Sequence, residues 1–164
     1  MLIYANTYNH GYVLDDDDAI VNNRFVQKGV AGLADIWTTE YRTGFSNESG
    51  SLYRPVSLSL FAIQTELWPG NSNAAHVFNI ILYGLCCMLL FLWLQLLFKS
   101  YDVWLPLIAS LIFTVLPIHT EVVANIKSVD EILSASFALV SLYSILKADN
   151  DGIQFTLEWS ERKR

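Results

Sequence analysis

Hydrophobic residues dominate the second half of the chain, whereas polar residues are spread through the first half. The longest apolar stretch covers residues 74–98, where the strongly polar residues are His76 and Asn79 near the start and Gln95 near the end. An α-helix rises about 1.5 Å per residue, so this length crosses a hydrocarbon core about 30 Å thick. The pattern predicts a transmembrane helix over residues 74–98.

Two further apolar stretches follow a short polar turn. Residues 103–118 are bracketed by Pro106 and Pro117 and number only sixteen, so flanking residues must help this stretch to span a bilayer. Residues 132–147 carry several serines among Leu, Phe, Val and Ile, which suits helix–helix packing inside a bundle. We therefore expect about three transmembrane helices within residues 74–148.

The polar first segment, residues 1–73, predicts short helices that lie on a membrane surface. Residues 25–37 have apolar positions at a helical spacing that Gly29 and Gly32 interrupt. Residues 38–51 have the composition of a loop. Pro55 suits the first turn of a second surface helix, which the Trp68-Pro-Gly70 sequence ends.

The composition supports a membrane setting. Of the 164 residues, 53% are hydrophobic and 16% are charged, against roughly 25% charged in ordinary soluble domains. The mean hydropathy is +0.35. The formal charge of −6, with basic residues gathered at the C-terminus, argues against nucleic-acid binding. The adjacent Cys86 and Cys87 lie in an apolar run and are interpreted as part of a membrane helix.

Lysines and arginines near the span ends predict the orientation. If residues 1–73 lie on one side, then Lys99, Lys147 and the basic residues 162–164 all fall on the other, whereas the short outer loop between the later spans offers only Lys127. The positive-inside rule then makes residues 1–73 extracytoplasmic and residues 149–164 a cytoplasmic basic tail. The N-terminus does not resemble a signal peptide. We therefore expect a fragment whose first transmembrane helix is missing.

Four consecutive aspartates, Asp15 to Asp18, are the main candidates for chemistry. A carboxylate can act as a general base, and neighbouring anions raise its pKa toward the working range. A second carboxylate can orient the first or bind a divalent metal ion, so metal use stays open. The segment lacks the spacing of an EF-hand loop. The same pattern also fits a solvated acidic turn without a chemical role.

The order of several short motifs resembles one family up to about residue 148. The motifs are Gly11-Tyr-Val-Leu-Asp15-Asp16, Ala19-Ile20, Asn22-Asn23, Tyr53-Arg54-Pro55, His76-Val-Phe-Asn79, Pro117-Ile-His119-Thr-Glu121 and Asp130-Glu131. Together they resemble the N-terminal part of the transmembrane and tetratricopeptide-repeat O-mannosyltransferases and their bacterial relatives. The variant Ala124-Asn-Ile-Lys127 is similar to bacterial members, in particular those of Bacteroidetes.

The resemblance implies an all-α membrane protein with a GT-C-like N-terminal region. Its first large external loop, here residues 1–73, would be periplasmic in a multi-pass protein of the bacterial inner membrane. The resemblance also implies a glycosyltransferase that passes a mannose-like sugar, with inversion, from a polyprenyl-phosphate donor to a protein or glycan acceptor. Asp15 and Asp16 fall on the family's acidic pair, so one of them is expected to be the general base; Asp17 and Asp18 fall on variable positions.

Five further residues become candidates for contacts with the donor phosphate or another part of the substrate: Arg54, His119, Glu121, Lys127 and Asp130. Arg54 can bind phosphate bidentately, although it equally suits an interfacial anchor or a partner for the aspartates. His119 can bond the phosphate or position an aspartate, and Glu121 can hold a cation. Both also fit an interfacial cap in water.

The chain also departs from the family pattern. It has Ser128-Val129 where the family usually has Gly-Arg, so Lys127 is the candidate to replace the missing arginine. No tetratricopeptide-repeat pattern follows the third span. Three helices hardly enclose a polyprenyl donor, which again predicts a truncated glycosyltransferase. The alternative function is a small non-catalytic integral membrane protein whose acidic loop binds cations or a partner.

Overall fold

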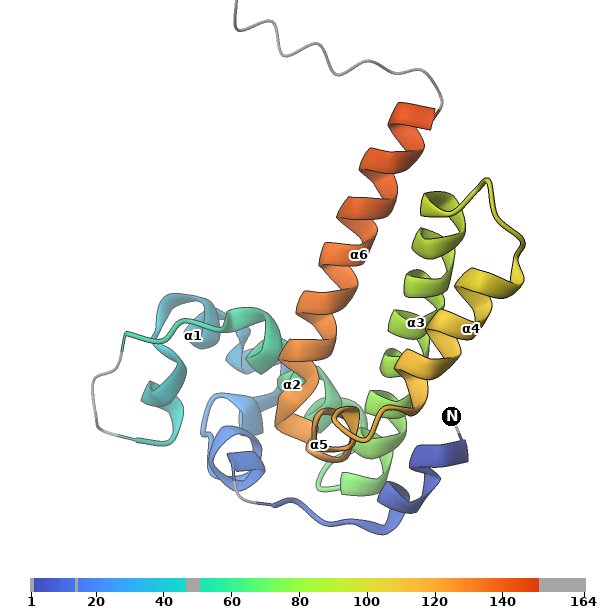
Figure 1. Cartoon of the computed structure of the whole chain (residues 1–164). Helices are drawn as coiled ribbons and strands as arrows, with labels where there is room; N and C mark the ends of the chain where they lie inside the picture. The colour runs from blue at the N-terminus through green and yellow to red at the C-terminus, as the bar shows by residue number, and fades with distance from the viewer. Residues whose placement is uncertain (1, 14, 47–50, 151–164) are drawn as a thin grey trace, which may run out of the picture.

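The computed structural model describes residues 2–13, 15–46 and 51–150, and every regular element in them is helical. Three longer helices extend to one side of a group of short ones (Figure 1). The longer helices are α3 (Ser72–Leu97), α4 (Trp104–Val115) and α6 (Val129–Asn150). α3 packs against both α4 and α6, so it is central to the longer helices.

The group of short helices is built from the polar first segment. It comprises η2 (Asp17–Val21), η3 (Val26–Gly32), α1 (Leu33–Thr38), η4 (Tyr41–Gly44) and α2 (Pro55–Leu67). The predicted interruption at Gly29 is confirmed, because this residue has a φ of 62°, in the left-handed region that favours glycine. Ile36, Leu58 and Phe61 are buried together and hold α1, α2 and their neighbours around one core.

A tight connection joins α2 to α3. Pro55 occupies the first turn of α2, as expected, and the helix ends just before Trp68. Gly70 has a φ of 66°, which lets the chain reverse. The side chain of Asn71 accepts a hydrogen bond from the Ala74 amide at 3.1 Å and caps the start of α3.

α4 is shorter than the span expected over residues 103–118. It has 12 residues and a length of about 18 Å, well below the thickness of a hydrocarbon core. It ends at Val115 because Leu116 precedes Pro117, and a residue before proline is restricted to the extended conformation that Leu116 adopts. The hydroxyls of Tyr4 and Tyr83 donate to the Thr114 carbonyl, which the helix end leaves unpaired.

Two helices are long and apolar enough to cross a membrane within the described part of the chain. They cover Ser72–Leu97 and Ile126–Asn150, with mean hydropathies of 2.4 and 1.5 over their most apolar windows. Only 17% and 11% of those windows are buried, so these helices present apolar side chains outward, unlike the core helix of a soluble protein. The chain is therefore an all-α membrane protein.

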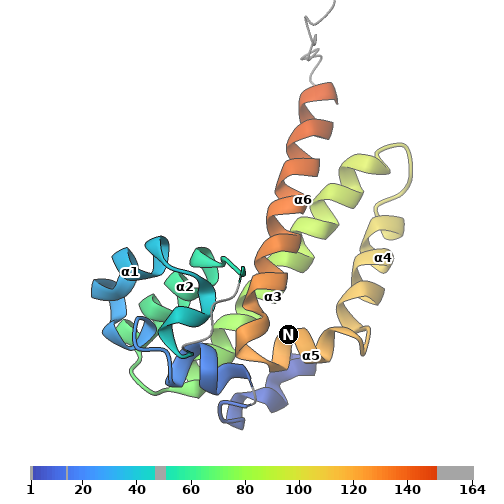
Figure 2. The same ribbon diagram turned by 90° about the vertical axis from the view of Figure 1, so that its left-hand side faces the viewer.

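The remaining short elements lie near the start of α3, on the same side of the molecule as the acidic segment, Asp15 to Asp18 (Figure 2). η1 (Leu2–Asn9) contacts α3 and α5 (His119–Ala124), and η5 (Ile126–Ser128) leads directly into α6. At the opposite end, the Lys99 ammonium bonds to the side chain of Asn150. The expected cytoplasmic tail, residues 149–164, lies outside the described residues from position 151 onward.

Candidate active site

Neighbouring aspartates at the start of the acidic segment have opposite surroundings. Asp16 is fully buried, and its two carboxylate oxygens accept the backbone N–H groups of Val13 at 3.2 Å and Lys127 at 2.7 Å. The carboxylate of Asp15 remains 65% exposed and forms an ion pair with the Lys127 ammonium at 2.7 Å. Asp16 therefore ties two distant segments together, whereas Asp15 faces solvent.

Three polar contacts hold the turn that presents Lys127. Asn79 on α3 donates to the carbonyls of Asn125 and Ile126, at 3.2 and 3.4 Å. The side chain of Asn125 accepts the Lys127 amide at 3.1 Å, next to the bond from Asp16. Because the turn is held both by Asn79 of α3 and by Asp16, the position from which the Lys127 side chain extends is fixed.

The different surroundings shift the two carboxyl pKa values in opposite directions. The hydrogen bond and the charge of Lys127 hold the pKa of the Asp15 carboxyl below its ordinary value. Burial raises the pKa of Asp16, although the backbone N–H groups that it accepts act in the other direction. Asp15 is thus a solvent-accessible carboxylate, while each oxygen of the buried Asp16 already accepts a backbone N–H group.

A second ion pair joins the start of α2 to the start of α6. The guanidinium of Arg54, half-buried before Pro55, pairs with the Asp130 carboxylate. The Tyr41 ring lies 5.9 Å from the centre of that guanidinium. Burial, followed by the negative charge of Asp130, raises the pKa of Tyr41 to about 12, so this phenol stays protonated at neutral pH and can donate a hydrogen bond.

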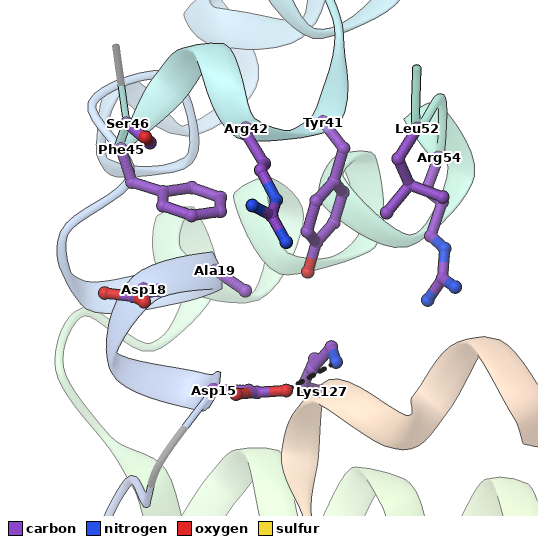
Figure 3. A pocket seen from close by; sticks show the side chains of 10 residues that line it. All are labelled: Asp15, Asp18, Ala19, Tyr41, Arg42, Phe45, Ser46, Leu52, Arg54 and Lys127. Atoms are coloured by element: carbon purple, nitrogen blue, oxygen red, sulfur yellow. Dashed lines mark hydrogen bonds and ion pairs between the residues drawn. The ribbon is translucent and has the colours of Figure 1, made fainter. Parts of the chain in front are cut away.

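A cavity of about 450 Å³ lies where these residues meet. Figure 3 shows Tyr41, Arg42 and Arg54 reaching toward the Asp15–Lys127 pair from the opposite wall. The lining residues are Asp15, Asp18, Ala19, Tyr41, Arg42, Phe45, Ser46, Leu52, Arg54 and Lys127. Three cations suit an anionic group, an exposed carboxylate suits a hydroxyl, and aromatic rings suit the face of a sugar. The cavity size is that of an ordinary small-molecule site.

The structure brings together five of the seven residues that the sequence singled out. Asp15, Arg54 and Lys127 line the cavity, Asp16 bonds to the turn of Lys127, and Asp130 pairs with Arg54. The other two, His119 and Glu121, lie on α5 away from this cavity.

His119 opens the short helix α5. Its ring packs against Phe113, at 4.3 Å between ring centres, and against Tyr83 at 5.7 Å. Glu121 is exposed on the same helix. Neither residue lines the cavity that holds Asp15. In this structure the family motif Pro117-Ile-His119-Thr-Glu121 therefore forms the connection from α4 to α5 and the start of α5.

Sequence reasoning missed Tyr41, Arg42 and Phe45, which line the cavity from η4 and the residue after it. Their stretch has the composition of a loop and no hydrophobic periodicity, a pattern that predicts only a connection. The one available signal was an arginine beside two aromatic residues in an acidic segment. Among the described residues, no group of three or more His, Cys, Asp or Glu side chains is placed to hold a metal ion.

The fold and this cavity define a helical membrane protein with oppositely charged groups gathered beside its spanning helices. Over most of its length, the chain is similar to proteins named as O-mannosyl-transferases, as the motif order implied. Protein O-mannosyl-transferase TMTC4 of Mus musculus is 35% identical over 90% of the chain. A Caenorhabditis elegans protein O-mannosyl-transferase is 31% identical over 94%, and TMTC1 of Homo sapiens is 30% identical over 92%.

The chain spans about a fifth of the length of these relatives, with 22%, 23% and 17% of each covered. No family model matches the chain. No solved structure matches it either.

Proposed function

We propose that this chain forms the acidic extracytoplasmic segment and adjoining membrane helices of a multi-pass glycosyltransferase. The enzyme transfers a mannose-like sugar from a polyprenyl-phosphate donor to a hydroxyl group of a protein or glycan acceptor. The observation that carries the proposal is one cavity that holds an exposed aspartate, Lys127 and Arg54 beside helices able to span a membrane. The similarity to O-mannosyl-transferases supports the reaction class.

Asp15 is the proposed general base. Its carboxylate takes the proton of the acceptor hydroxyl, whose oxygen attacks the anomeric carbon from the face opposite the phosphate. The bond from that carbon to the phosphate oxygen breaks, and the phosphate leaves with the electron pair. The anomeric centre is inverted because the attack and the departure occur on opposite faces. Lys127 and Arg54 are the proposed counter-charges for the leaving phosphate. Asp16 is less suited to take a proton because both of its oxygens accept backbone N–H groups.

The test replaces each aspartate separately in a full-length relative, TMTC4 of Mus musculus, at the positions aligned with Asp15 and Asp16. We expect Asp15→Asn to lower turnover of the lipid-linked sugar by about 10²- to 10⁴-fold, the usual contribution of a general base. Its thermal unfolding midpoint should stay near that of the wild type because the exposed ion pair contributes little stability.

Asp16→Asn provides the contrast within the same motif. Its amide places a donor against one of two buried backbone N–H groups, so the variant should unfold at a lower temperature and lose activity through folding. Wild-type turnover in Asp15→Asn would show that the base is another residue. A folded Asp16→Asn enzyme with no turnover would move the base to Asp16.

A further inference from the structure

The ammonium of Lys127 and the carboxylate of Asp15 form a contact that can be exchanged. Their backbones are held relative to one another through Asp16, whose side chain bonds to the Lys127 amide at 2.7 Å. Their side chains are 26% and 65% exposed, and ion pairs this accessible to water contribute little to stability. The long lysine stem can therefore swing within the cavity at low cost while the backbone stays in place.

The ion pairs of Lys127 and Arg54 differ in what they would lose by such a change. Arg54 pairs with Asp130, a carboxylate that is 19% exposed and lies outside the cavity lining. Lys127 pairs with a carboxylate that lines the cavity itself. An anion that enters the cavity thus meets Asp15 as a direct competitor for the Lys127 ammonium. Asp18 also lines the cavity but lies to one side of that pair (Figure 3).

We infer that a phosphate group bound in this cavity takes the Lys127 ammonium from Asp15, so that binding of the phosphate frees the Asp15 carboxylate. A phosphate group carries at least one full negative charge and offers several acceptor oxygens, so it can replace a single carboxylate contact. The exchange moves an ammonium between two anions and breaks no covalent bond.

The exchange has a chemical consequence, which rests on the proposed glycosyltransferase function. While Lys127 is paired with Asp15, it holds the pKa of that carboxyl below its ordinary value and occupies one of its oxygens. A carboxylate in that state is a weak base. Once the phosphate holds Lys127, Asp15 regains its basicity and can receive an acceptor hydroxyl. The donor therefore has to bind before the acceptor is deprotonated, which makes Lys127 a positioning residue that couples the two substrates.

The test measures phosphate binding by this chain in lipid nanodiscs, without any turnover. Inorganic phosphate is titrated in one arm, and a polyprenyl monophosphate incorporated in the nanodisc is titrated in the other. The spectroscopic readout is ¹⁵N-labelled lysine and arginine side chains, because Arg42 and Arg54 also line the cavity and remain when Lys127 is replaced. The variants are Asp15→Asn, Lys127→Gln, their combination, and Asp18→Asn, which removes the same charge from the same cavity.

Competition predicts that Asp15→Asn tightens phosphate binding about threefold to fivefold more than Asp18→Asn does. Lys127→Gln should weaken binding, and Asp15→Asn should then give no more tightening than Asp18→Asn, because no ammonium is left to compete for. Such coupling in the lipid arm assigns the site to a lipid-linked phosphate, and coupling in the inorganic arm alone assigns it to a soluble one.

Equal tightening by Asp15→Asn and Asp18→Asn would overturn the exchange, because a general charge effect would then explain both. The same holds if Asp15→Asn tightens binding equally with and without Lys127, or if neither arm shows binding. Since the readout is binding, a failed transferase assay leaves this result untouched, and a failed exchange leaves Asp15 available as a base.

Discussion

The adjacent carboxylates of Asp15 and Asp16 have different surroundings because the helical turn places one toward the cavity and the other toward the protein interior. Asp16 points into the protein and replaces water for two backbone N–H groups, the nearby one of Val13 and the distant one of Lys127. The bond to Lys127 stabilises the junction between residues 13–16 and the turn before α6. Asp15 points into the cavity and keeps most of its surface in water. The choice between them as base is therefore a matter of accessibility rather than of residue type.

The lowered pKa of Asp15 predicts a specific dependence of stability on pH. A carboxyl whose pKa is lower in the folded state adds stability above its unfolded value of 3.8 and loses it as the pH falls through the folded value. We expect Asp15→Asn to reduce the free energy of unfolding by at most about 1 kcal/mol near pH 6, and the difference from wild type to vanish toward pH 2.

Denaturant unfolding in detergent, followed from about pH 2 to pH 6, measures this difference. A Lys127→Gln background is the control, since without the ammonium the substitution at Asp15 should lose most of its pH-dependent effect. A difference that stays constant down to the lowest pH would contradict the assignment of the shift to Lys127.

Among the elements, the junction between η3 and α1 leaves no room for a side chain at Gly32. A Cβ added at Gly32 would lie 2.0 Å from the Phe25 carbonyl oxygen, a backbone atom that cannot move aside cheaply. We expect Gly32→Ala to reduce the free energy of unfolding by about 1–3 kcal/mol, the usual cost of overpacking. Gly11→Ala is the matched control because its added Cβ meets nothing within 4 Å. Equal stability of the two variants would show that the junction can relax.

Local sequence signals predicted the elements where one feature dominates. Pro55 and the Trp68-Pro-Gly70 sequence bounded α2, and sustained hydropathy predicted the helices that became α3 and α6. Hydropathy overestimated α4 because it cannot register that Leu116, an apolar residue, is kept out of the helix by the proline after it.

The pairings between residues far apart in the chain could not be predicted from the sequence, for a different reason. Asp15 and Lys127 are 112 positions apart, so no periodicity relates them. The family resemblance supplied residue types but no distances between them, so it could not show that the His119 ring packs against Phe113. Tyr41 and Arg42 had neither periodicity nor a motif to mark them. The site exists only once α3 and α2 have brought three separate segments together.

At the scale of the whole molecule, polar contacts mark two opposite ends. The Asp15–Lys127 and Arg54–Asp130 pairs lie where α6 begins, and the Lys99–Asn150 contact lies where α3 and α6 end. The 26 residues of α3 separate these ends by about 39 Å, enough to cross a bilayer. Figure 1 shows the short helices at one end and the α3–α4 connection at the other.

This polarity predicts which residues a membrane-impermeant maleimide reaches in intact cells. Ala31→Cys, on the exposed face of η3, should be labelled from outside, and Ser100→Cys, in the α3–α4 connection, only after permeabilisation. The native Cys86 and Cys87 are 3% and 8% exposed, so the unmodified chain is the control and should stay unlabelled. Labelling of both new cysteines from one side would contradict the spanning of α3. Reversed labelling would agree with a spanning α3 but would place the cavity on the cytoplasmic face. That result would contradict the orientation that the positive-inside rule predicts from the lysines at the opposite end.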